Sequence, residues 1–204
     1  SIFEEGQNKV NEKSIKNSNN IYGKTKLYGE ELIKYFAKKY NFQYCILRYF
    51  NVIGSDKFLR TGALRDSGHL FMNITNSIIN KTYKVNIYGN NFNTPDGTGI
   101  RDFIDVEDIS SIHLASYEKM LKNKKSYEIN CGIGKGYSVL DILSSFEKVI
   151  GKKFKTISKK KRFGDVEKII CENKYLKKTL NYKFKYSLED SIRKYINWNK
   201  KIRT

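Results

Sequence analysis

The sequence is poor in cysteine, and its three cysteines do not form a CxxC pair. Cys45, Cys131 and Cys171 each lie in or beside an apolar run. This arrangement argues against a zinc site or a disulfide framework, and it favours buried free thiols in a reducing compartment. We therefore expect no metal site.

Long apolar runs are also missing. No stretch is long enough to span a bilayer, and the first residues, Ser1–Glu5, do not have the pattern of a signal peptide. Apolar residues make up 39% of the chain and aromatic residues 14%, which suffices for a globular protein and argues against disorder. The 204 residues can form one domain, or one domain and part of another. We expect a soluble, cytoplasmic protein with no membrane partner.

Acidic residues are scarce relative to basic ones: 21 Asp and Glu stand against 39 Lys and Arg, which gives a net charge of +18. Such an excess suggests a polyanionic partner such as nucleic acid. The lysines are spread along the chain, however, with one dense cluster at Lys159–Arg162. Lys, Asn, Ile and Tyr are all abundant, and all four have AT-rich codons. We favour this compositional origin of the charge and expect no nucleic-acid partner.

The order of helical and strand patterns predicts an α/β fold. A helix is expected from Asn19–Ile21 to Tyr40, and the apolar run 42–50 has the character of a buried parallel strand. Residues 1–20 are expected to form an irregular entry segment. Further strands are expected at 85–88, 100–106, 126–130 and 154–157, and further helices at 69–81, 109–121 (capped by Asp108 or Glu107), 139–150, 173–180 and 188–198.

A glycine loop, Gly132–Gly136, stands between a predicted strand and a predicted helix, where a dinucleotide-binding loop would lie. Its spacing is GxGxG rather than GxGxxG, and no acidic residue ends a second strand about 20 residues further on. Ser138 and Asp141 have the spacing of a helix-capping pair. A tight structural turn is favoured over a phosphate site.

A tyrosine and a lysine four residues apart, Tyr22 and Lys26, lie at the start of the first predicted helix. Residues i and i+4 share a helix face, so the phenol and the ammonium could serve one site. The cation would favour the phenolate and allow proton exchange near neutral pH. A chance pair on the surface would have the same spacing, because the chain holds 15 Tyr and 39 Lys and Arg. The pair alone leaves both interpretations open.

Several segments together resemble the UDP-glucose 4-epimerases of the extended short-chain dehydrogenase/reductase superfamily. The Tyr-x-x-x-Lys pattern marks only the superfamily, whereas residues 94–108, TPDGTGIRDFIDVED, are more specific to these epimerases. The resemblance runs from about residue 3 to Trp198. The other matching segments are LRYFN at 47–51, the glycine loop with 137–140, and RFGD at 162–165.

The resemblance implies an α/β fold made of the C-terminal part of a Rossmann-like NAD-binding domain and a smaller α/β domain for the UDP-sugar. Residues 1–55 would belong to the first domain, with 100–122 packing back on it, and 56–99 and 123–204 to the second. The family's glycine-rich NAD loop and its sugar-binding Ser or Thr would lie ahead of Ser1. We therefore expect this chain to hold only part of the cofactor site, and the whole protein to be a homodimer.

The resemblance also implies a reaction, with NAD as the cofactor. UDP-glucose and UDP-galactose would be interconverted through a transient 4-keto sugar, and Tyr22 would exchange the proton of the sugar 4-hydroxyl. Lys26 would bind the nicotinamide ribose and tune the tyrosine. Tyr49 and Phe50 would lie beside the nicotinamide.

The substrate-binding residues are implied in the same way. Arg101 and Arg162 would clamp the diphosphate, a role suited to a planar, permanently charged group. Asp165 would hold a ribose hydroxyl, and Ile169 stands where the family limits the room for an N-acetyl group. The remaining positions are Asn51 for the sugar nucleotide, His69 and Leu70 at the start of the UDP pocket, and Asn86, Ile87 and Tyr88 along the uracil.

Some positions depart from the family pattern. Ile21 stands for a usual Pro, Phe103 for a usual Tyr and Asp105 for a usual His, and none of these changes removes a group that the reaction needs. His113, on an apolar helix face, is expected to be structural. Two alternatives remain: a related NAD-dependent nucleotide-sugar dehydratase or decarboxylase, and a non-enzymatic basic binding fragment.

Overall fold

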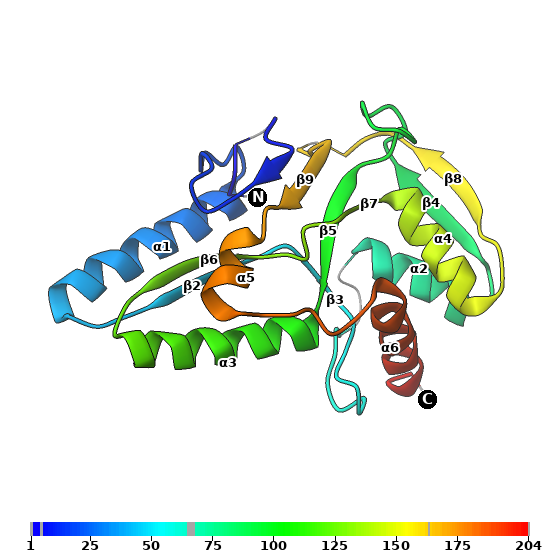
Figure 1. Cartoon of the computed structure of the whole chain (residues 1–204). Coiled ribbons are helices and arrows are strands. Elements are labelled where there is room, and N and C mark those ends of the chain that lie inside the picture. Colours follow the sequence, from blue (N-terminus) through cyan, green and yellow to red (C-terminus); the bar gives the residue numbers. More distant parts are fainter. Residues whose placement is uncertain (1, 5, 65–67, 163, 204) are drawn as a thin grey trace.

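The computed structural model describes residues 2–4, 6–64, 68–162 and 164–203, and Figure 1 shows how their helices and strands are arranged. Part of the matched segment 162–165, Phe163, lies outside the described residues, as does Ser1. The elements are β1 (Lys9–Val10), α1 (Ile21–Tyr40), β2 (Cys45–Tyr49), β3 (Asn51–Ile53), α2 (Leu70–Ile79), β4 (Lys84–Tyr88), β5 (Ile100–Asp105), α3 (Val106–Asn123), β6 (Tyr127–Cys131), β7 (Gly136–Ser138), α4 (Val139–Ile150), β8 (Lys155–Lys159), β9 (Lys168–Cys171), α5 (Lys174–Leu180) and α6 (Leu188–Lys201).

The strand β5 is the centre of the sheet arrangement. It pairs in parallel with β3 and β9 and antiparallel with β7, and β1 extends this sheet beyond β9. Two separate parallel pairs, β2–β6 and β4–β8, lie on either side of it. Parallel pairs linked through helices are the hallmark of an α/β protein, so the predicted fold class is confirmed.

Two apolar clusters divide the molecule into two lobes (Figure 1). In the β2–β6 lobe, β6, α3 and α5 pack around the fully buried Ile112 and Ile129, while α1 lies on the other side of the strand pair. In the β4–β8 lobe, α2, α4 and α6 pack around Phe71 and Phe146. Because β6 and α5 pack with the first lobe, we propose that they belong to the NAD-binding domain rather than to the substrate domain. Within the described residues, no helix is both long and apolar enough to cross a membrane.

Most predicted elements are present, but the sheet at the centre was incompletely predicted. The sequence predicts no strand at β3, β7 or β9, and β1 lies within the entry segment 1–20. Helix α3 also begins earlier than expected, at Val106, and its cap is Asp105 rather than Asp108 or Glu107. The Asp105 carboxylate accepts a hydrogen bond from the Glu107 amide at 2.9 Å and lies 2.8 Å from Lys194 Nζ of α6. Asp105, which stands for the family's usual His, thus caps α3 and forms an ion pair with α6.

Residues 94–99, the first part of the segment 94–108, form hydrogen bonds to the start of α4. One Asp96 oxygen accepts hydrogen bonds from Thr98 N at 2.9 Å and Thr98 Oγ1 at 2.8 Å, and the other accepts from Ser138 Oγ, the N-cap of α4. Thr98 Oγ1 in turn accepts from the Val139 amide at 3.0 Å. Burial alone would raise the pKa of Asp96. Hydrogen bonds from Ser138 and Thr98 outweigh burial and hold this pKa below its usual range. This network joins the loop before β5 to the β4–β8 lobe.

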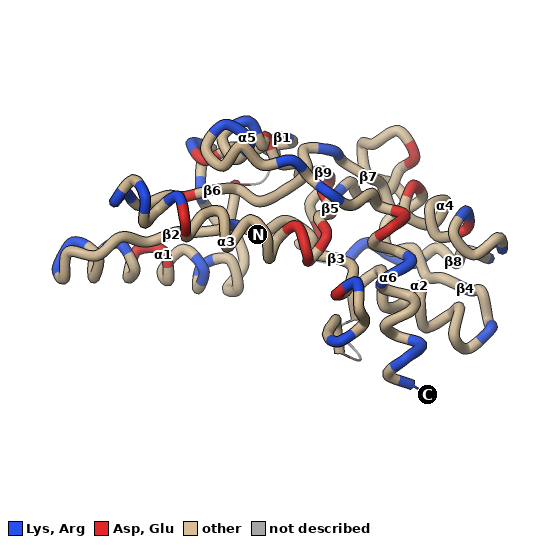
Figure 2. Tube along the Cα trace, turned by 60° about the horizontal axis from the view of Figure 1, so that its bottom comes forward, with Lys and Arg blue, Asp and Glu red and all other residues tan. Residues whose placement is uncertain are grey.

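Figure 2 shows Lys and Arg along both lobes rather than in a single patch. The edge strand β8 is exposed along its whole length and carries Lys155 and Lys159. Lysines on an exposed strand discourage pairing with other chains. Part of the positive charge therefore has a structural use that needs no polyanion.

The turn at Gly97 requires glycine for two reasons. Its φ is +74°, and a Cβ there would overlap the backbone oxygen of Asn90. We expect Gly97→Ala to lower the free energy of unfolding by about 2–4 kcal/mol, because left-handed strain and a backbone clash add together. Urea titration followed by circular dichroism measures this change.

Gly151 provides the matched control. Its φ is +69°, but a Cβ there would meet nothing within 4 Å. Gly151→Ala should cost only roughly 1 kcal/mol, the strain of the left-handed conformation alone. Equal losses for the two variants would contradict the proposed clash at Gly97.

Candidate active site

A cavity of about 1650 Å³ opens between the two lobes. It is lined by residues from α1, α2, α3 and the strands β2, β3, β4, β5 and β9, so segments far apart in the sequence meet there. All but one of the predicted site residues line it: Tyr22, Lys26, Tyr49, Phe50, Asn51, His69, Leu70, Asn86, Tyr88, Arg101, Arg162, Asp165 and Ile169.

Ile87 is the exception, because its side chain points away from the cavity. Strand β4 alternates between exposed or half-buried and buried positions, and Asn86 and Tyr88 face the cavity while Val85 and Ile87 face the core. Ile87 is 7% exposed and packs in the cluster of the β4–β8 lobe. A strand presents alternate residues to opposite faces, so Ile87 contributes no side chain to the cavity.

Tyr22 and Lys26 lie in the first turns of α1. The helix begins at Ile21, where the Asn20 side chain accepts a hydrogen bond from the Gly23 amide at 2.7 Å, which fixes the start without the family's proline. Lys26 Nζ is 5.1 Å from the centre of the Tyr22 ring. The tyrosine is 63% exposed, so its hydroxyl is accessible from the cavity. The i, i+4 spacing thus brings the two side chains together.

At the end of β2, Tyr49 bonds to a histidine that the sequence did not connect with the site. Tyr49 Oη and His113 Nε2 are 2.6 Å apart, and His113 Nδ1 is 2.8 Å from the backbone oxygen of Ile109. A carbonyl can only accept, so Nδ1 donates to it; in the neutral imidazole Nε2 then accepts from the Tyr49 hydroxyl. Burial, and to a lesser degree Cys131, raises the pKa of Tyr49. His113, an exposed residue of α3, therefore bonds to the backbone of its own helix and orients a cavity side chain.

The two predicted diphosphate ligands are held in different ways. Arg101, in β5, donates to the backbone oxygens of Val166 at 2.6 Å and Ile100 at 2.9 Å, and burial lowers its pKa, although Asp165 opposes this. The Arg162 guanidinium stacks 4.0 Å from the ring centre of Tyr88. Arg101 thus binds the backbone next to Asp165. The side chains of Arg101 and Arg162 both line the cavity.

The helix α2 begins at the cavity wall. His69 is its N-cap but makes no side-chain capping bond, and Leu70, Phe71 and Asn73 also line the cavity. The first amides of a helix point outward without intrahelical partners and carry partial positive charge. Together with the two arginines they make this side of the cavity suitable for an anionic group.

The glycine loop does not belong to the cavity, because its amides bind a carboxylate of the protein itself. Asp102 of β5 is fully buried, and it accepts hydrogen bonds from the amides of Ile133 at 3.0 Å, Gly134 at 2.9 Å and Cys171 at 3.1 Å. The Ser138–Asp141 capping box is present as predicted. The loop is the tight structural turn that its spacing favoured, and it is not available to a phosphate.

Comparison with known proteins decides the family. The model of the NAD dependent epimerase/dehydratase family matches residues 1–132, more than half of the chain. The chain belongs to this family. Among curated relatives, the UDP-glucose 4-epimerase of Lactobacillus helveticus is 32% identical over 196 residues, which are 94% of this chain and 58% of that protein. The chain spans about half the length of the curated relatives it matches.

Solved epimerase structures share the fold. The UDP-glucose 4-epimerase of Stenotrophomonas maltophila, crystallised with NAD and formylated UDP-arabinopyranose, matches with a TM-score of 0.89 and 27% identity over 94% of this chain and 58% of that one. The enzyme of Bifidobacterium longum, in complex with NAD+ and UDP, matches with a TM-score of 0.86 and 26% identity over 97% of this chain and 60% of that one. The chain therefore has the Rossmann-like architecture of an NAD-dependent epimerase.

The cavity of this epimerase-family chain fits part of a dinucleotide. Phe50, half-buried, lies directly after Tyr49, and both border the same cavity as Tyr22 and Lys26. A flat ring and ribose can lie against aromatic and cationic side chains of this kind. The amides of the glycine loop are used by Asp102, so in the described part of the chain this loop offers nothing to a pyrophosphate. The residues present fit the nicotinamide end of NAD.

Substitution of Asp102 tests the assignment of the glycine loop. In Asp102→Asn an NH2 group would replace one carboxylate oxygen and leave at least one buried amide donor unpaired. We expect a loss of about 2–4 kcal/mol in the free energy of unfolding. Chemical denaturation measures it.

Asp190→Asn is the control for this prediction. Asp190 is half-exposed and accepts hydrogen bonds from Ser187 on one of its oxygens, which the asparagine oxygen can replace. Its cost should stay below about 1 kcal/mol. If Asp102→Asn lowered the free energy of unfolding by no more than Asp190→Asn does, the Asp102 carboxylate would not be the group that orders the glycine loop.

Proposed function

We propose that this chain supplies the substrate site and the Tyr-Lys pair of an NAD-dependent UDP-glucose 4-epimerase, with UDP-glucose and UDP-galactose as substrates. The observation that carries the proposal is the shared cavity: Tyr22 and Lys26 border the same space as Arg101 and Arg162. A proton-transfer group and a pair of guanidinium groups in one cavity suit a sugar joined to a diphosphate. The family and the epimerase relatives agree with this chemistry.

The nucleotide would be held by the β4–β8 lobe and β9. Arg101 and Arg162 would bind the diphosphate together with the first amides of α2, and Asp165 would accept from a ribose hydroxyl. Asn86 and Tyr88 would contact the uracil; the Tyr88 ring already supports Arg162 by stacking. Asn51 and Ile169 would border the sugar, and Ile169 leaves more room there than a tyrosine would.

The chemical step would use the β2–β6 lobe. Tyr22 would take the proton of the sugar 4-hydroxyl and return it after the sugar has turned over in the cavity, while the arginines keep the nucleotide in place. Bound NAD would supply the reversible hydride transfer at C4 of the sugar. Lys26, Tyr49 and Phe50 would hold its nicotinamide riboside end.

A further segment would complete the cofactor site. Among described residues, β2 pairs with β6 on one edge and with no strand on the other, and its residues line the cavity along their whole length. We propose that a strand of a cofactor-binding segment joins this edge, on the same polypeptide or another. The exposed apolar residues of α1, among them Leu32 and Tyr35, would suit a homodimer contact. Such an enzyme would serve galactose metabolism in the cytoplasm.

Binding of UDP tests the substrate site without the cofactor. Isothermal titration of the chain with UDP should give a measurable dissociation constant, and Arg162→Met should weaken it at least tenfold through loss of a charge-assisted contact. Arg193→Met removes the same charge from an exposed ion pair on α6 and should leave the affinity within twofold. Absence of UDP binding, combined with RNA binding that falls steeply with salt, would overturn the proposal in favour of a basic binding module.

The chemical step is tested separately. We expect the 204-residue chain alone to turn over no UDP-glucose. When the first part of an epimerase relative is supplied as a second chain, UDP-galactose should form, and Tyr22→Phe should reduce kcat by roughly 100-fold or more, because the proton acceptor is removed. Product is measured by chromatography of the nucleotide sugars. Full activity of Tyr22→Phe would show that another group moves the proton.

A further inference from the structure

The helix α1 contacts the rest of its lobe along one narrow stripe. Its buried residues are Gly23, Glu30 and Ala37, and Leu27 and Lys34 are half-buried between them. This spacing of four and three residues follows one face of a helix over four turns. Two of the five positions are charged, so the middle of the contact is ionic rather than apolar.

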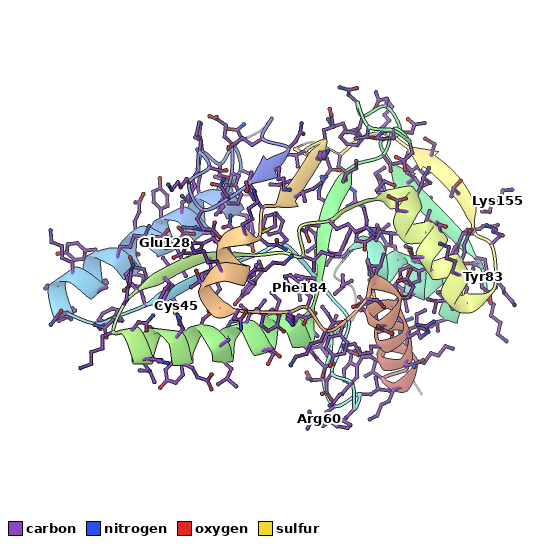
Figure 3. All side chains as sticks on the ribbon, viewed as in Figure 1. Cys45, Arg60, Tyr83, Glu128, Lys155 and Phe184 are labelled. Atoms are coloured by element: carbon purple, nitrogen blue, oxygen red, sulfur yellow. The ribbon has the colours of Figure 1, made fainter. Side chains whose placement is uncertain are left out.

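Four side chains at this stripe are linked in the order Glu30, Arg48, Glu128 and Lys34, and we call them the α1 ion-pair ring. Arg48 of β2, 6% exposed, donates from Nε to Glu30 Oε1 at 2.7 Å and from Nη2 to Glu30 Oε2 at 2.6 Å. Arg48 Nη2 also contacts the Glu128 carboxylate, and Lys34 Nζ lies 2.6 Å from Glu128 Oε1. Figure 3 labels Glu128 on β6, beneath α1. The ring joins the helix at two points to both strands of the lobe.

The Glu30–Arg48 pair has the geometry that fixes orientation best. Two parallel hydrogen bonds between a guanidinium and a carboxylate define a plane as well as a distance. Removal of one partner of a buried ion pair leaves the other charge buried without compensation, and this lowers the free energy of unfolding. The apolar side chains of the stripe are Leu27, which packs on the small cluster of Ile2, Phe3 and Val10, and the buried Ala37. Between them the ion pairs hold the helix to the strands.

The pair also connects the two groups of residues that border the chemical end of the cavity. Tyr22, Lys26 and Glu30 lie on successive turns of α1 and all line the cavity, and on β2 Arg48 directly precedes residues 49–51. Eight residues of helix span about 12 Å, so a tilt of about 10° at Glu30 would move Tyr22 by about 2 Å. A misplacement of about 1 Å can already lower a rate about 100-fold.

We propose that the α1 ion-pair ring is a positioning device, in which the Glu30–Arg48 pair sets the tilt of α1 and thereby the place of Tyr22 and Lys26 relative to Asn51. Its consequence for catalysis rests on the function proposed above, whereas its effect on the helix does not. Glu30 and Arg48 are positioning residues: they act on the reacting groups through the helix and the strand.

Amide hydrogen exchange of the purified chain, followed by mass spectrometry, tests the proposal. In Glu30→Gln we expect exchange in the segment 21–40 to accelerate at least tenfold, with α4 and α6 unchanged and the UDP dissociation constant within twofold of the original. Glu31→Gln removes the same charge from the exposed neighbouring position and should change neither quantity. Arg48→Lys keeps the charge but loses the second parallel bond, so it should accelerate exchange in 21–40 less than Glu30→Gln does. This variant replaces Glu30→Gln in the test if Glu30→Gln does not fold.

Two results would overturn the proposal. Unchanged exchange in 21–40 would show that apolar contacts hold the helix, and equal acceleration in every helix would show that the ring stabilises the whole fold instead of positioning one element. In the two-chain epimerase assay, Glu30→Gln should lower kcat at least tenfold and leave KM for the UDP-sugar within threefold. Failure of the original chain to bind UDP would overturn the proposed function but leave the exchange result as evidence on the ring.

Discussion

The buried carboxylate of Asp102 is the interaction on which the assembly of the cavity depends. It accepts hydrogen bonds from amides in the β6–β7 loop and at the end of β9, and it projects from β5. The bonded loop amides are 31 and 32 residues from Asp102, and the bonded amide of β9 is 69 residues from it, so no local preference would bring the three segments together. Once they are joined, Arg101 and Ile169 are neighbours in parallel register. The Asp102 carboxylate thus takes the loop amides that a phosphate would need, and it holds together strands that line the cavity.

Local sequence signals predicted the helices well, because their causes are local. The caps at Asn20, Ser138 and Ser187 are side chains that accept a hydrogen bond from the amide three residues on, and such bonds need no tertiary structure. Strands β1 and β9 were missed for the opposite reason. A two-residue strand at Lys9–Val10 exists only because Ile170 and Cys171 lie beside it, and nothing in either segment alone indicates the pairing.

The expected site residues rest on motifs, which carry no geometry, and this explains where the structure differs from the expectation. A motif names positions but not directions, so Ile87 was grouped with Asn86 and Tyr88 although alternate residues of a strand face opposite sides. His113 was assigned to packing because helical spacing shows a face but not a partner on another strand, and Tyr49 is that partner. The glycine loop was judged correctly from its spacing, whereas the carboxylate that fills it could not be recognised from sequence.

The contact of α1 with its lobe combines few apolar side chains with a set of ion pairs. In the middle of the α1 stripe the helix is held by the ion-pair ring. Such a ring costs desolvation energy but specifies orientation more sharply than apolar packing does. Under the proposed function α1 carries the proton-transfer group, so its orientation must be closely fixed. The other lobe uses the same device, because Lys194 of α6 lies 2.8 Å from Asp105 and 2.7 Å from Glu107, so in both lobes ionic contacts place a helix against a strand.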